Sequence, residues 1–437
     1  MDMFAFSAEL EKAIEDSPVY LRFDPEIGDF TKPTKSSLTV CGKKYTATTT
    51  LDNTEEGFQL NSIVAVLAKR VFNKGSTVLT WDIKRFLSYL AFHLKNYHPV
   101  IEANLIDLRY SEAYCGIEKP KPKDFREAMI RTKSFVQNKD WLNIYKKIHL
   151  PLALTVLPQL ESRGLLDLGN KQVRYINYEI EGQTNGRMSC SRLGPDFLNV
   201  HGLTPELREQ LATRRELNRL FVELDFHHME VNVLQWLSGD QQLRDIIESG
   251  ADVYASIYEL LRGQSCVTAE QRSFAKQVFL PVMFGMQANS LAAKVGMTLE
   301  QSQQLIAKLA ESFPTSFKWM LDKELEIQDC PQVTDYFGRI RDFSNVPPYK
   351  RRNFEIQSPA SAICLERLIK LYEELGDHLL FHVHDAYVLC CEASELKQIT
   401  KQARSVLESP SDLCPGLKLT VDCHVGYNLS VTKLYPK

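Results

Sequence analysis

Two aspartates at predicted strand ends carry the first chemical signal in this sequence. In FHVHDAYVLCCE, residues 381–392, strand-like residues flank Asp385, which places it at the tip of a tight hairpin. In RLFVELDFHHME, a predicted strand runs from Leu220 to Asp225 and continues into a helix. If the two strands are neighbours, both carboxylates converge on one point and form a site for a hard divalent cation such as Mg²⁺. The alternative is a pair of unrelated surface acids, because Asp is common in turns.

Between these aspartates, a predicted helix carries side chains suited to a nucleotide. Arg272, Lys276, Leu280 and Phe284 follow one another at intervals of four residues, which keeps them on one slowly drifting helical stripe. Two cations at the start of that stripe bind a triphosphate, and the apolar residues further on stack on a base and sugar. The alternative is a helix with a solvated basic end and a buried apolar face. Pro281 lies in the same segment and is expected to kink or break the helix.

The composition is that of a folded protein with more than one domain. The chain has 437 residues, enough for two or three domains, of which 44% are hydrophobic and 24% charged. The formal net charge of −3 gives no global basic character, although 52 Lys and Arg residues can form a local basic groove. Ten cysteines without CxxC pairs suit reduced thiols inside a cell. We find no apolar run of about 18 residues and no basic leader, so we expect neither a membrane span nor a secretory signal.

The order of predicted elements divides the chain into an N-terminal α/β domain and a larger C-terminal domain. Over residues 1–117, short strands alternate with helices, which is typical of an α/β layer structure. Residues 118–145 begin with a Pro- and Lys-rich stretch, and we interpret them as a linker. Residues 146–437 contain both aspartates, with a mainly helical part at about 241–330.

These stretches, in this order, resemble the family-A DNA polymerases, the group of bacterial DNA polymerase I. The first shared motif is a strand-end Asp followed five residues later by Glu, in a segment that closes in LSGD. The second is Arg, then Lys four residues on, then an aromatic residue and Gly eight and nine further. The third is the His-Asp hairpin, and NFEIQSPASAI and TNGRMSCS resemble two further motifs. The matching positions are Asp225, Glu230, Arg272, Lys276, Phe284, Gly285, His384, Asp385, Asn353, Gln357 and Arg187.

The resemblance implies a template-directed DNA polymerase that adds dNTPs to a primer 3′ end by two-metal phosphoryl transfer. Two Mg²⁺ ions, or Mn²⁺ in their place, are expected on Asp225 and Asp385, with the backbone carbonyl of Phe226 assisting. Glu230 is expected to exclude a ribose 2′ hydroxyl. The implied nucleotide-binding residues are Arg272, Lys276, Leu280, Phe284 and Glu230, and the implied DNA-binding residues are Arg187, Asn353, Gln357 and His384.

The same resemblance implies partners and a location. The partners are primer–template DNA and dNTPs, with a processivity partner or self-association left open. The location is the cytoplasm beside the nucleoid, or the interior of an infected cell if the chain is encoded by a phage. Two other functions stay open at this point. One is a polymerase-derived DNA-binding accessory protein without synthesis, and the other is a 3′–5′ exonuclease.

The N-terminal domain resembles, more weakly, the proofreading 3′–5′ exonuclease of that family, which has an RNase H-like fold. Asp24 and Glu26 stand two residues apart, on one face of a predicted strand, and Asp82 ends another strand. The family's site also needs a Tyr and an Asp on one later helix. The sequence offers Asp124 there but no Tyr in frame. We therefore interpret this domain as a degenerate remnant, with an active nuclease as the alternative.

The expected fold class is α/β (α+β): an exonuclease-like domain, then a polymerase palm with helical fingers. The thumb is expected to be absent or minimal, because only about 17 residues, 168–184, separate the joining helix from the Arg187 loop. Three single positions also depart from the family. Leu280 stands where Phe or Tyr is usual, Phe284 where Tyr is frequent, and Ala386 where Glu usually follows the hairpin Asp.

Overall fold

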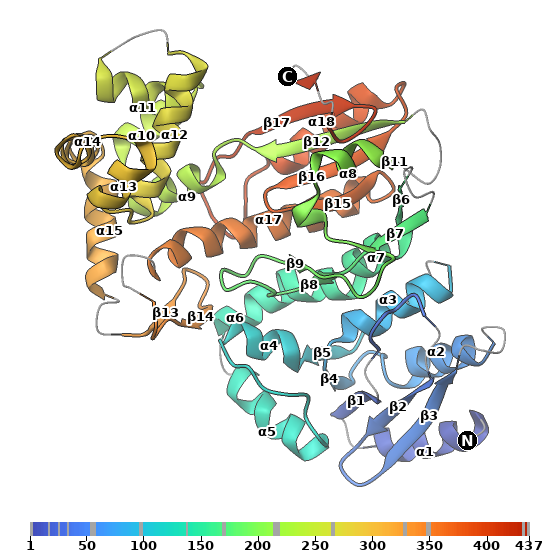
Figure 1. The fold of residues 1–437 in the computed structure, drawn as a ribbon. Helices are drawn as coiled ribbons and strands as arrows, with labels where there is room; N and C mark the ends of the chain where they lie inside the picture. Colours follow the sequence, from blue (N-terminus) through green and yellow to red (C-terminus); the bar gives the residue numbers. More distant parts are fainter. Residues whose placement is uncertain are drawn as a thin grey trace.

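The fold was analysed in a computed structural model. It describes residues 3–15, 18–24, 27–32, 35–52, 58–95, 99–136, 139–167, 172–212, 219–263, 267–326, 330–346, 351–430 and 433–434. Figure 1 shows an N-terminal sheet at one end of the molecule, a second sheet at the other, and a set of helices extending beside the second sheet.

The N-terminal region is built on a five-stranded mixed sheet of order β3-β2-β1-β4-β5. β1 pairs antiparallel with β2 and parallel with β4, and β4 pairs parallel with β5. Among the described residues, β1, β2 and β3 follow one another without a helix between them, and the alternation of strands and helices that the sequence pattern predicts begins after β3. The elements are α1 (Met3–Ile14), β1 (Val19–Asp24), β2 (Lys35–Cys41), β3 (Thr46–Asp52), α2 (Phe58–Arg70), β4 (Thr77–Thr80), α3 (Ile83–His93), β5 (Asn104–Asp107) and α4 (Leu108–Tyr114).

A helical segment joins this sheet to the rest of the chain. α5 (Phe125–Val136) and α6 (Lys139–Ile144) lie within the predicted linker, so most of that linker is helix rather than extended chain. α6 continues through the π-helical turns η1 (Tyr145–His149) and η2 (Leu152–Val156) into α7 (Leu157–Arg163). α7 ends at Gly164, whose φ of 68° is a backbone conformation that favours glycine.

Residues 168–184, the short interval for which we expect no thumb or a minimal one, contain strands in their described part. β6 (Leu165–Asp167) and β7 (Gln172–Ile176) pair antiparallel, and β8 (Tyr178–Glu179) pairs with β9 (Ser189–Cys190). The described residues of 168–184 contain no helix. β10 (Phe197–Leu198), the short helix η3 (Val200–Gly202), α8 (Pro205–Gln210) and β11 (Leu211–Ala212) follow.

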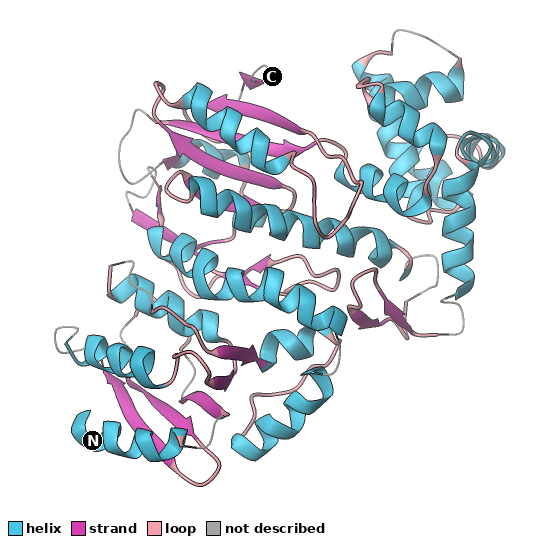
Figure 2. Cartoon of the chain, turned by 180° about the vertical axis from the view of Figure 1, so that it is seen from behind, coloured by secondary structure: helices cyan, strands magenta, loops and turns pink. Residues whose placement is uncertain are grey.

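The second sheet has the order β15-β16-β12-β17-β18 and carries both aspartates of interest. Alternation along β12 sends Val222, Leu224 and Phe226 into the core, while Glu223 and Asp225 are half-buried on the other face. α17 and α18 cover the apolar face, as the view from behind in Figure 2 shows for α18. The elements are β12 (Leu220–Phe226), α17 (Asn353–Leu375), β15 (Leu379–Val383), β16 (Ala386–Cys391), α18 (Leu396–Leu407), β17 (Val421–Gly426) and β18 (Lys433–Leu434).

Between β12 and α17 the chain forms the helical region that the sequence predicts at about 241–330. Its helices are α9 (Met229–Ser238), α10 (Gln241–Glu248), α11 (Val253–Arg262), α12 (Ala269–Met283), α13 (Ala288–Val295), α14 (Leu299–Ser312) and α15 (Pro314–Glu326). α12 runs through Pro281 and ends two residues later. The expected break at Pro281 is therefore wrong, because a proline in the last turn removes only one hydrogen bond of the helix. The hairpin of β13 (Gln332–Thr334) and β14 (Ile340–Asp342) leads into α17.

Buried ion pairs connect segments of the chain that are far apart in the sequence. Lys84 of α3 donates to Glu161 of α7 at 2.7 Å, and both side chains are 0% exposed. Deeper in the molecule, Glu181 accepts from Arg339 and Arg341, each at 2.7 Å. The apolar side chains of both sheets also form one contiguous core. The N-terminal region thus packs against the rest of the chain through a shared core and a buried ion pair.

Glu181→Gln is expected to lower the free energy of unfolding by about 3–5 kcal/mol, because it leaves two arginines buried without their full counter-charge. Urea denaturation measures the loss. Asp322→Asn is the matched control, since Asp322 pairs with Lys318 on the surface, and its loss should stay below about 1 kcal/mol. A Glu181→Gln protein as stable as wild type would show that the cluster does not support the fold.

Candidate active site

Asp225 and Asp385 meet on the second sheet. β15 and β16 form a hairpin in which Val383 pairs with Ala386, so His384 and Asp385 are its two-residue tip. β16 pairs with β12, with Asp225 opposite Ala386, and the Phe226 amide donates to the backbone carbonyl of Asp385 at 3.3 Å. The two aspartates, about 160 positions apart in sequence, are therefore neighbours at the same end of adjacent strands.

The surroundings of Asp225 disfavour its negative charge. Burial raises the pKa of this carboxyl to about 7, and the nearby charges of Asp385, Glu223 and Asp422 add to the effect. Lys276 acts in the opposite direction, but more weakly. A cation close to this carboxylate would therefore favour its charged form.

The same carboxylate has an oxygen suited to a cation. Asp225 Oδ1 is buried and has no hydrogen-bond partner among the described residues. Buried polar atoms are almost always paired, so an orphaned carboxylate oxygen next to a second carboxylate indicates a missing cation. The donor set of carboxylate oxygens is the one that Mg²⁺ and Mn²⁺ prefer. The residues present therefore fit a divalent metal site.

The α12 helix brings its cations together over an aromatic ring. Arg272 and Lys276 lie over the ring of Tyr254, with 5.5 Å and 5.8 Å to its centroid. Arg272 Nε also donates to Asp252 Oδ2 at 2.7 Å, while Lys276 is exposed. Both cations thus stand at the N-terminal half of α12, clear of the core face formed by residues such as Val278.

Leu280 and Phe284 continue the stripe of α12. Both are half-buried, and each is packed against the core without being enclosed by it. Asn353 of α17 donates to the backbone carbonyl of Phe284 at 3.2 Å, which ties the end of α12 to α17. Arg272 and Lys276 thus share a contact on one side of α12, whereas Phe284 is the residue that follows the helix.

Glu230 is the centre of a polar network beside the aspartates. Its Oε1 accepts from Arg187 at 3.2 Å and from Gln357 at 3.3 Å. Gln357 in turn accepts from Asn185 at 3.2 Å. Burial raises the pKa of Glu230, against the opposing charge of Arg187. The network joins the start of α9, the loop after β8 and α17, so these three predicted site residues are held in one place.

His384 lies at the hairpin tip with φ 56°, in the left-handed region. Its ring packs against that of His201, with 4.7 Å between centroids. Burial lowers the pKa of His384, and the positive charge of Arg187 adds to this effect. The neutral form is therefore favoured at the position next to Asp385.

Comparison with known proteins agrees with this geometry. The model of DNA polymerase family A matches residues 153–431, which is well over half of the chain. The chain belongs to DNA polymerase family A.

Relatives in this family are distant and longer than this chain. The thermostable DNA polymerase I of Thermus aquaticus is 28% identical over 255 residues, which cover 54% of this chain and 30% of that protein. DNA polymerase I of Chloroflexus aurantiacus is 28% identical over 296 residues, covering 63% of this chain and 31% of its own length. The chain thus spans less than a third of the length of these relatives.

The fold is shared with a solved structure, the POL domain of Pol1 from M. smegmatis in complex with DNA primer-template and dNTP. The TM-score is 0.74 with 13% sequence identity, and the match covers 99% of each chain. At this identity the likeness shows the fold.

Several residues near the family-A site were not expected from sequence. His227, His228 and Asp252 have ligand atoms within 4.8 Å of one another, the only such group of three in the part of the chain that the structure describes. Both Asp252 oxygens are engaged, one by Arg272 and the other by the Ala255 amide. Asp252 therefore serves to hold Arg272 and to cap α11. In the sequence, the only indication of this group was the pair His227 and His228, which follows the strand-end Asp225.

Of the three predicted N-terminal acids, the two that the structure describes, Asp24 and Asp82, are each paired with cations of the chain. Asp24 pairs with Arg22 and with Lys121, the latter at 2.8 Å. Burial alone would raise the pKa of Asp24, but the hydrogen bonds from Lys121 and Arg22 outweigh it, so its pKa is lowered. Glu26 lies outside the described residues. The position of Asp24 is therefore already neutralised from within the chain.

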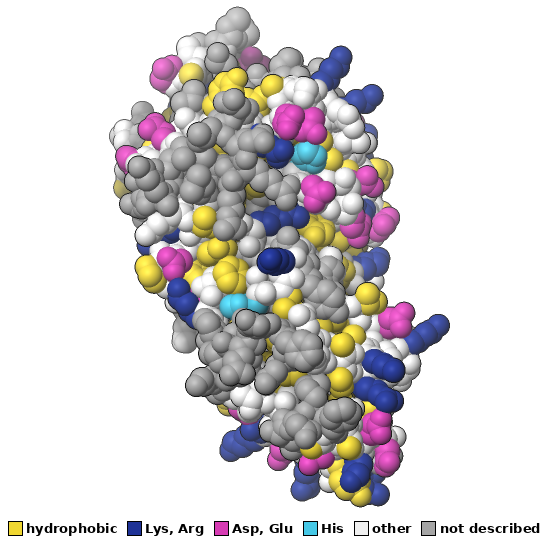
Figure 3. Space-filling view, turned by 90° about the vertical axis from the view of Figure 1, so that its right-hand side faces the viewer, with side chains coloured by type: hydrophobic (Ala, Val, Ile, Leu, Met, Phe, Trp, Pro, Cys, Tyr) yellow, Lys and Arg dark blue, Asp and Glu magenta, His cyan; other side chains and the backbone are white. Residues whose placement is uncertain are grey.

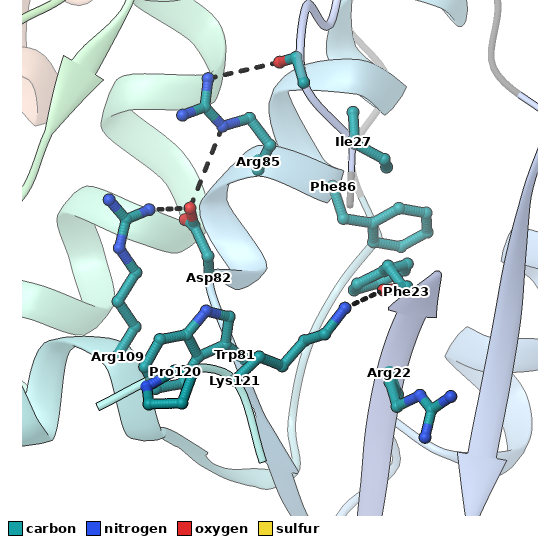
Figure 4. Close-up of a pocket in the computed structure, with 11 residues that line it drawn as sticks. Arg22, Phe23, Ile27, Trp81, Asp82, Arg85, Phe86, Arg109, Pro120 and Lys121 are labelled. Carbon is teal, nitrogen blue, oxygen red and sulfur yellow. Dashed lines mark hydrogen bonds and ion pairs between the residues drawn. The ribbon is translucent and has the colours of Figure 1, made fainter. Parts of the chain in front are cut away.

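Asp82 is neutralised in the same way. Figure 4 shows Arg109 and Arg85 directed at its carboxylate, inside a pocket of about 520 Å³. Its pKa is lowered, because Arg109 and the neighbouring cations outweigh the effect of burial. Tyr110 donates a further hydrogen bond at 2.7 Å. Four cations thus pair with Asp24 and Asp82, two of the three acids that the sequence associates with a nuclease.

Charged side chains of both signs are mixed on one face of the molecule. On the face drawn in Figure 3, Lys and Arg side chains are interspersed with Asp and Glu rather than gathered in one patch. Among the described residues, no helix is both long and apolar enough to cross a membrane.

Family-A polymerases generally use divalent metal ions, and Asp225 and Asp385 are the carboxylates of this chain that fit such an ion.

Because the pKa of Asp225 is raised to about 7, its proton must leave when a divalent metal binds. We expect Mg²⁺ binding to release more protons at pH 6 than at pH 8, and the apparent affinity to fall by up to about tenfold per pH unit below 7. Calorimetry in two buffers with different ionisation enthalpies measures the protons released. Asp225→Asn is the control and should release none. Equal proton release by both proteins at pH 6 would contradict the assignment.

Proposed function

We propose that this chain is a template-directed DNA polymerase that adds dNTPs to a primer 3′ end. The observation that carries the proposal is the meeting of Asp225 and Asp385 on adjacent strands of a family-A fold. An orphaned Oδ1 of Asp225 and two cations on α12 complete the set of groups that phosphoryl transfer requires. DNA primer–template and dNTPs are the proposed partners, as in the complex of the M. smegmatis domain.

Asp225 and Asp385 would hold two Mg²⁺ ions, with the backbone carbonyl of Phe226 as a further ligand. Bound metal ions supply charge stabilisation to the attacking and leaving oxygens of a phosphoryl transfer. Arg272 and Lys276 would bind the triphosphate, and Asp252 keeps the Arg272 guanidinium oriented beforehand. Leu280 and Phe284 would contact the sugar and base of the incoming nucleotide.

We propose that Glu230 selects the sugar. The carboxylate is held by Arg187 and Gln357, so its position is fixed before a nucleotide arrives. A fixed side chain beside the 2′ position crowds a hydroxyl there. Arg187, Gln357, Asn353 and His384 would then contact primer and template near the growing end.

The N-terminal region is proposed as an exonuclease-like remnant with a structural role. Its mixed sheet, three antiparallel strands followed by two parallel ones, supports an RNase H-like origin. The cations paired with Asp24 and Asp82 argue against nuclease metals at those positions. This observation makes an active nuclease the weaker candidate.

We propose that the chain lacks a thumb. The described part of 168–184 consists of strands and turns and contains no helix, which supports this proposal. Phosphate contacts supply most of the sequence-independent affinity for DNA. A polymerase with fewer of them is expected to leave DNA often, or to depend on a processivity partner or a second copy.

Primer extension by the purified chain tests the proposed function. We expect wild type to extend a labelled primer with Mg²⁺ or Mn²⁺, and Asp225→Ala or Asp385→Ala to lose at least about 100-fold in rate. Asp322→Asn, which removes an exposed carboxylate on α15, is the control and should retain wild-type activity. Primer binding without extension under either metal would favour an accessory protein without synthesis.

Sugar selection is tested by the ratio of dNTP to rNTP incorporation. Glu230→Ala removes the bulk beside the 2′ position and should raise rNTP incorporation by about tenfold or more relative to wild type. Glu230→Gln keeps the size of the side chain and should retain most of the selectivity. If Glu230→Ala discriminates as wild type does, another residue sets the preference.

The thumb proposal predicts distributive synthesis that is sensitive to salt. With excess unlabelled trap DNA, one binding event should yield only one or a few added nucleotides, because loss of phosphate contacts raises the dissociation rate. Raising the salt from about 50 to 200 mM should reduce extension strongly. The same reaction without trap is the control and should accumulate longer products. Products hundreds of nucleotides long in the presence of trap would exclude the proposal.

A further inference from the structure

Asp225 stands in the middle of a row of three residues across the second sheet. It pairs with Ala386 of β16 on one side and with Asp422 of β17 on the other. Residues directly opposite each other in antiparallel strands share a face, with about 4.5–5.5 Å between their Cβ atoms. Asp225 is therefore flanked by a methyl group on one side and by a second carboxylate on the other.

This arrangement is unfavourable unless a cation offsets it. Like charges directly opposite each other destabilise a sheet, and Asp422 is half-buried, which strengthens the repulsion. Within the described residues, no hydrogen bond or ion pair engages the Asp422 carboxylate. Glu223, one row further along the same face, is paired with Arg208 at 2.9 Å. Among the described residues of this face, Asp225 and Asp422 are thus the acids without a cationic partner.

Room for hydrated ions lies beside this row. Asp225 lines an open cavity of about 550 Å³ together with Glu223 and His424, the residue two positions beyond Asp422 on the same face of β17. The β17 side of Asp225 is therefore accessible, whereas its β16 side carries the buried Ala386.

We propose that Asp422 is the third carboxylate of the metal site, supplying from β17 the acid that Ala386 does not supply from β16. The proposal rests on the proposed function. Asp422 is a positioning residue: the ligand atoms of the three aspartates are not all within 4.8 Å of one another, so it acts on the water that Mg²⁺ retains. A carboxylate there accepts hydrogen bonds from such water and balances part of the metal charge.

The test compares metal binding and primer extension in Asp422→Asn, with Asp322→Asn, which removes an exposed carboxylate on α15, as the control that should leave both unchanged. For Asp422→Asn we expect Mn²⁺ affinity, measured by electron paramagnetic resonance, to fall about tenfold. The Mg²⁺ concentration for half-maximal extension should rise by a similar factor. Without metal, the melting temperature of Asp422→Asn should equal or exceed that of wild type, because a repulsion has been removed.

A second-site variant separates a metal role from a change in the local fold. Ala386→Glu added to Asp422→Asn places a carboxylate on the other side of Asp225 and should recover Mn²⁺ affinity to within about threefold of wild type. Mn²⁺ affinity equal to wild type in Asp422→Asn would overturn the proposal, even if primer extension proceeds. A tenfold loss of Mn²⁺ affinity in a chain that extends no primer would support the role of Asp422 and refute the polymerase function instead.

Discussion

Glu181 is the charge on which the arrangement of this molecule depends. Its fully buried carboxylate accepts from Arg339 and Arg341 of the β13–β14 hairpin, and His149 Nε2 of the helical connection lies 3.0 Å away. A buried carboxylate without these partners would be strongly unfavourable, so the three segments must come together for the chain to fold. Glu181 itself adopts φ 57°, a costly conformation for a residue other than glycine, which the surrounding ion pairs maintain.

The position of Glu181 matters for the proposed site because the Arg187 turn follows it directly. Gly186, in that turn, lies so close to the Arg339 guanidinium that a Cβ would clash with it. Arg339 also bonds to Asp335 and to Ser358 of α17, one residue from Gln357. Buried charges that are not themselves members of the polar network around Glu230 therefore help to set its orientation.

The sequence was sufficient for features that depend on local pattern. Alternation of apolar residues placed Asp225 at a strand end, and two strand-like runs around Asp385 predicted the hairpin tip. Spacing by four residues put Arg272 and Lys276 on one side of a helix. Pairings across long distances were not predictable in this way. The Asp422 neighbour of Asp225 follows from the register of β17, and the partners of Glu181 come from two segments far from it in the sequence.

The pairing of Lys84 with Glu161 has a consequence for how the chain folds. One residue belongs to the N-terminal sheet region and the other to the helix that leads to the palm, and both are fully buried in a core that spans the two. Expressed alone, either part would present an apolar surface bearing an unmatched charge. We therefore expect removal of either part to destabilise the other, because one of the two charges would stay buried without its partner.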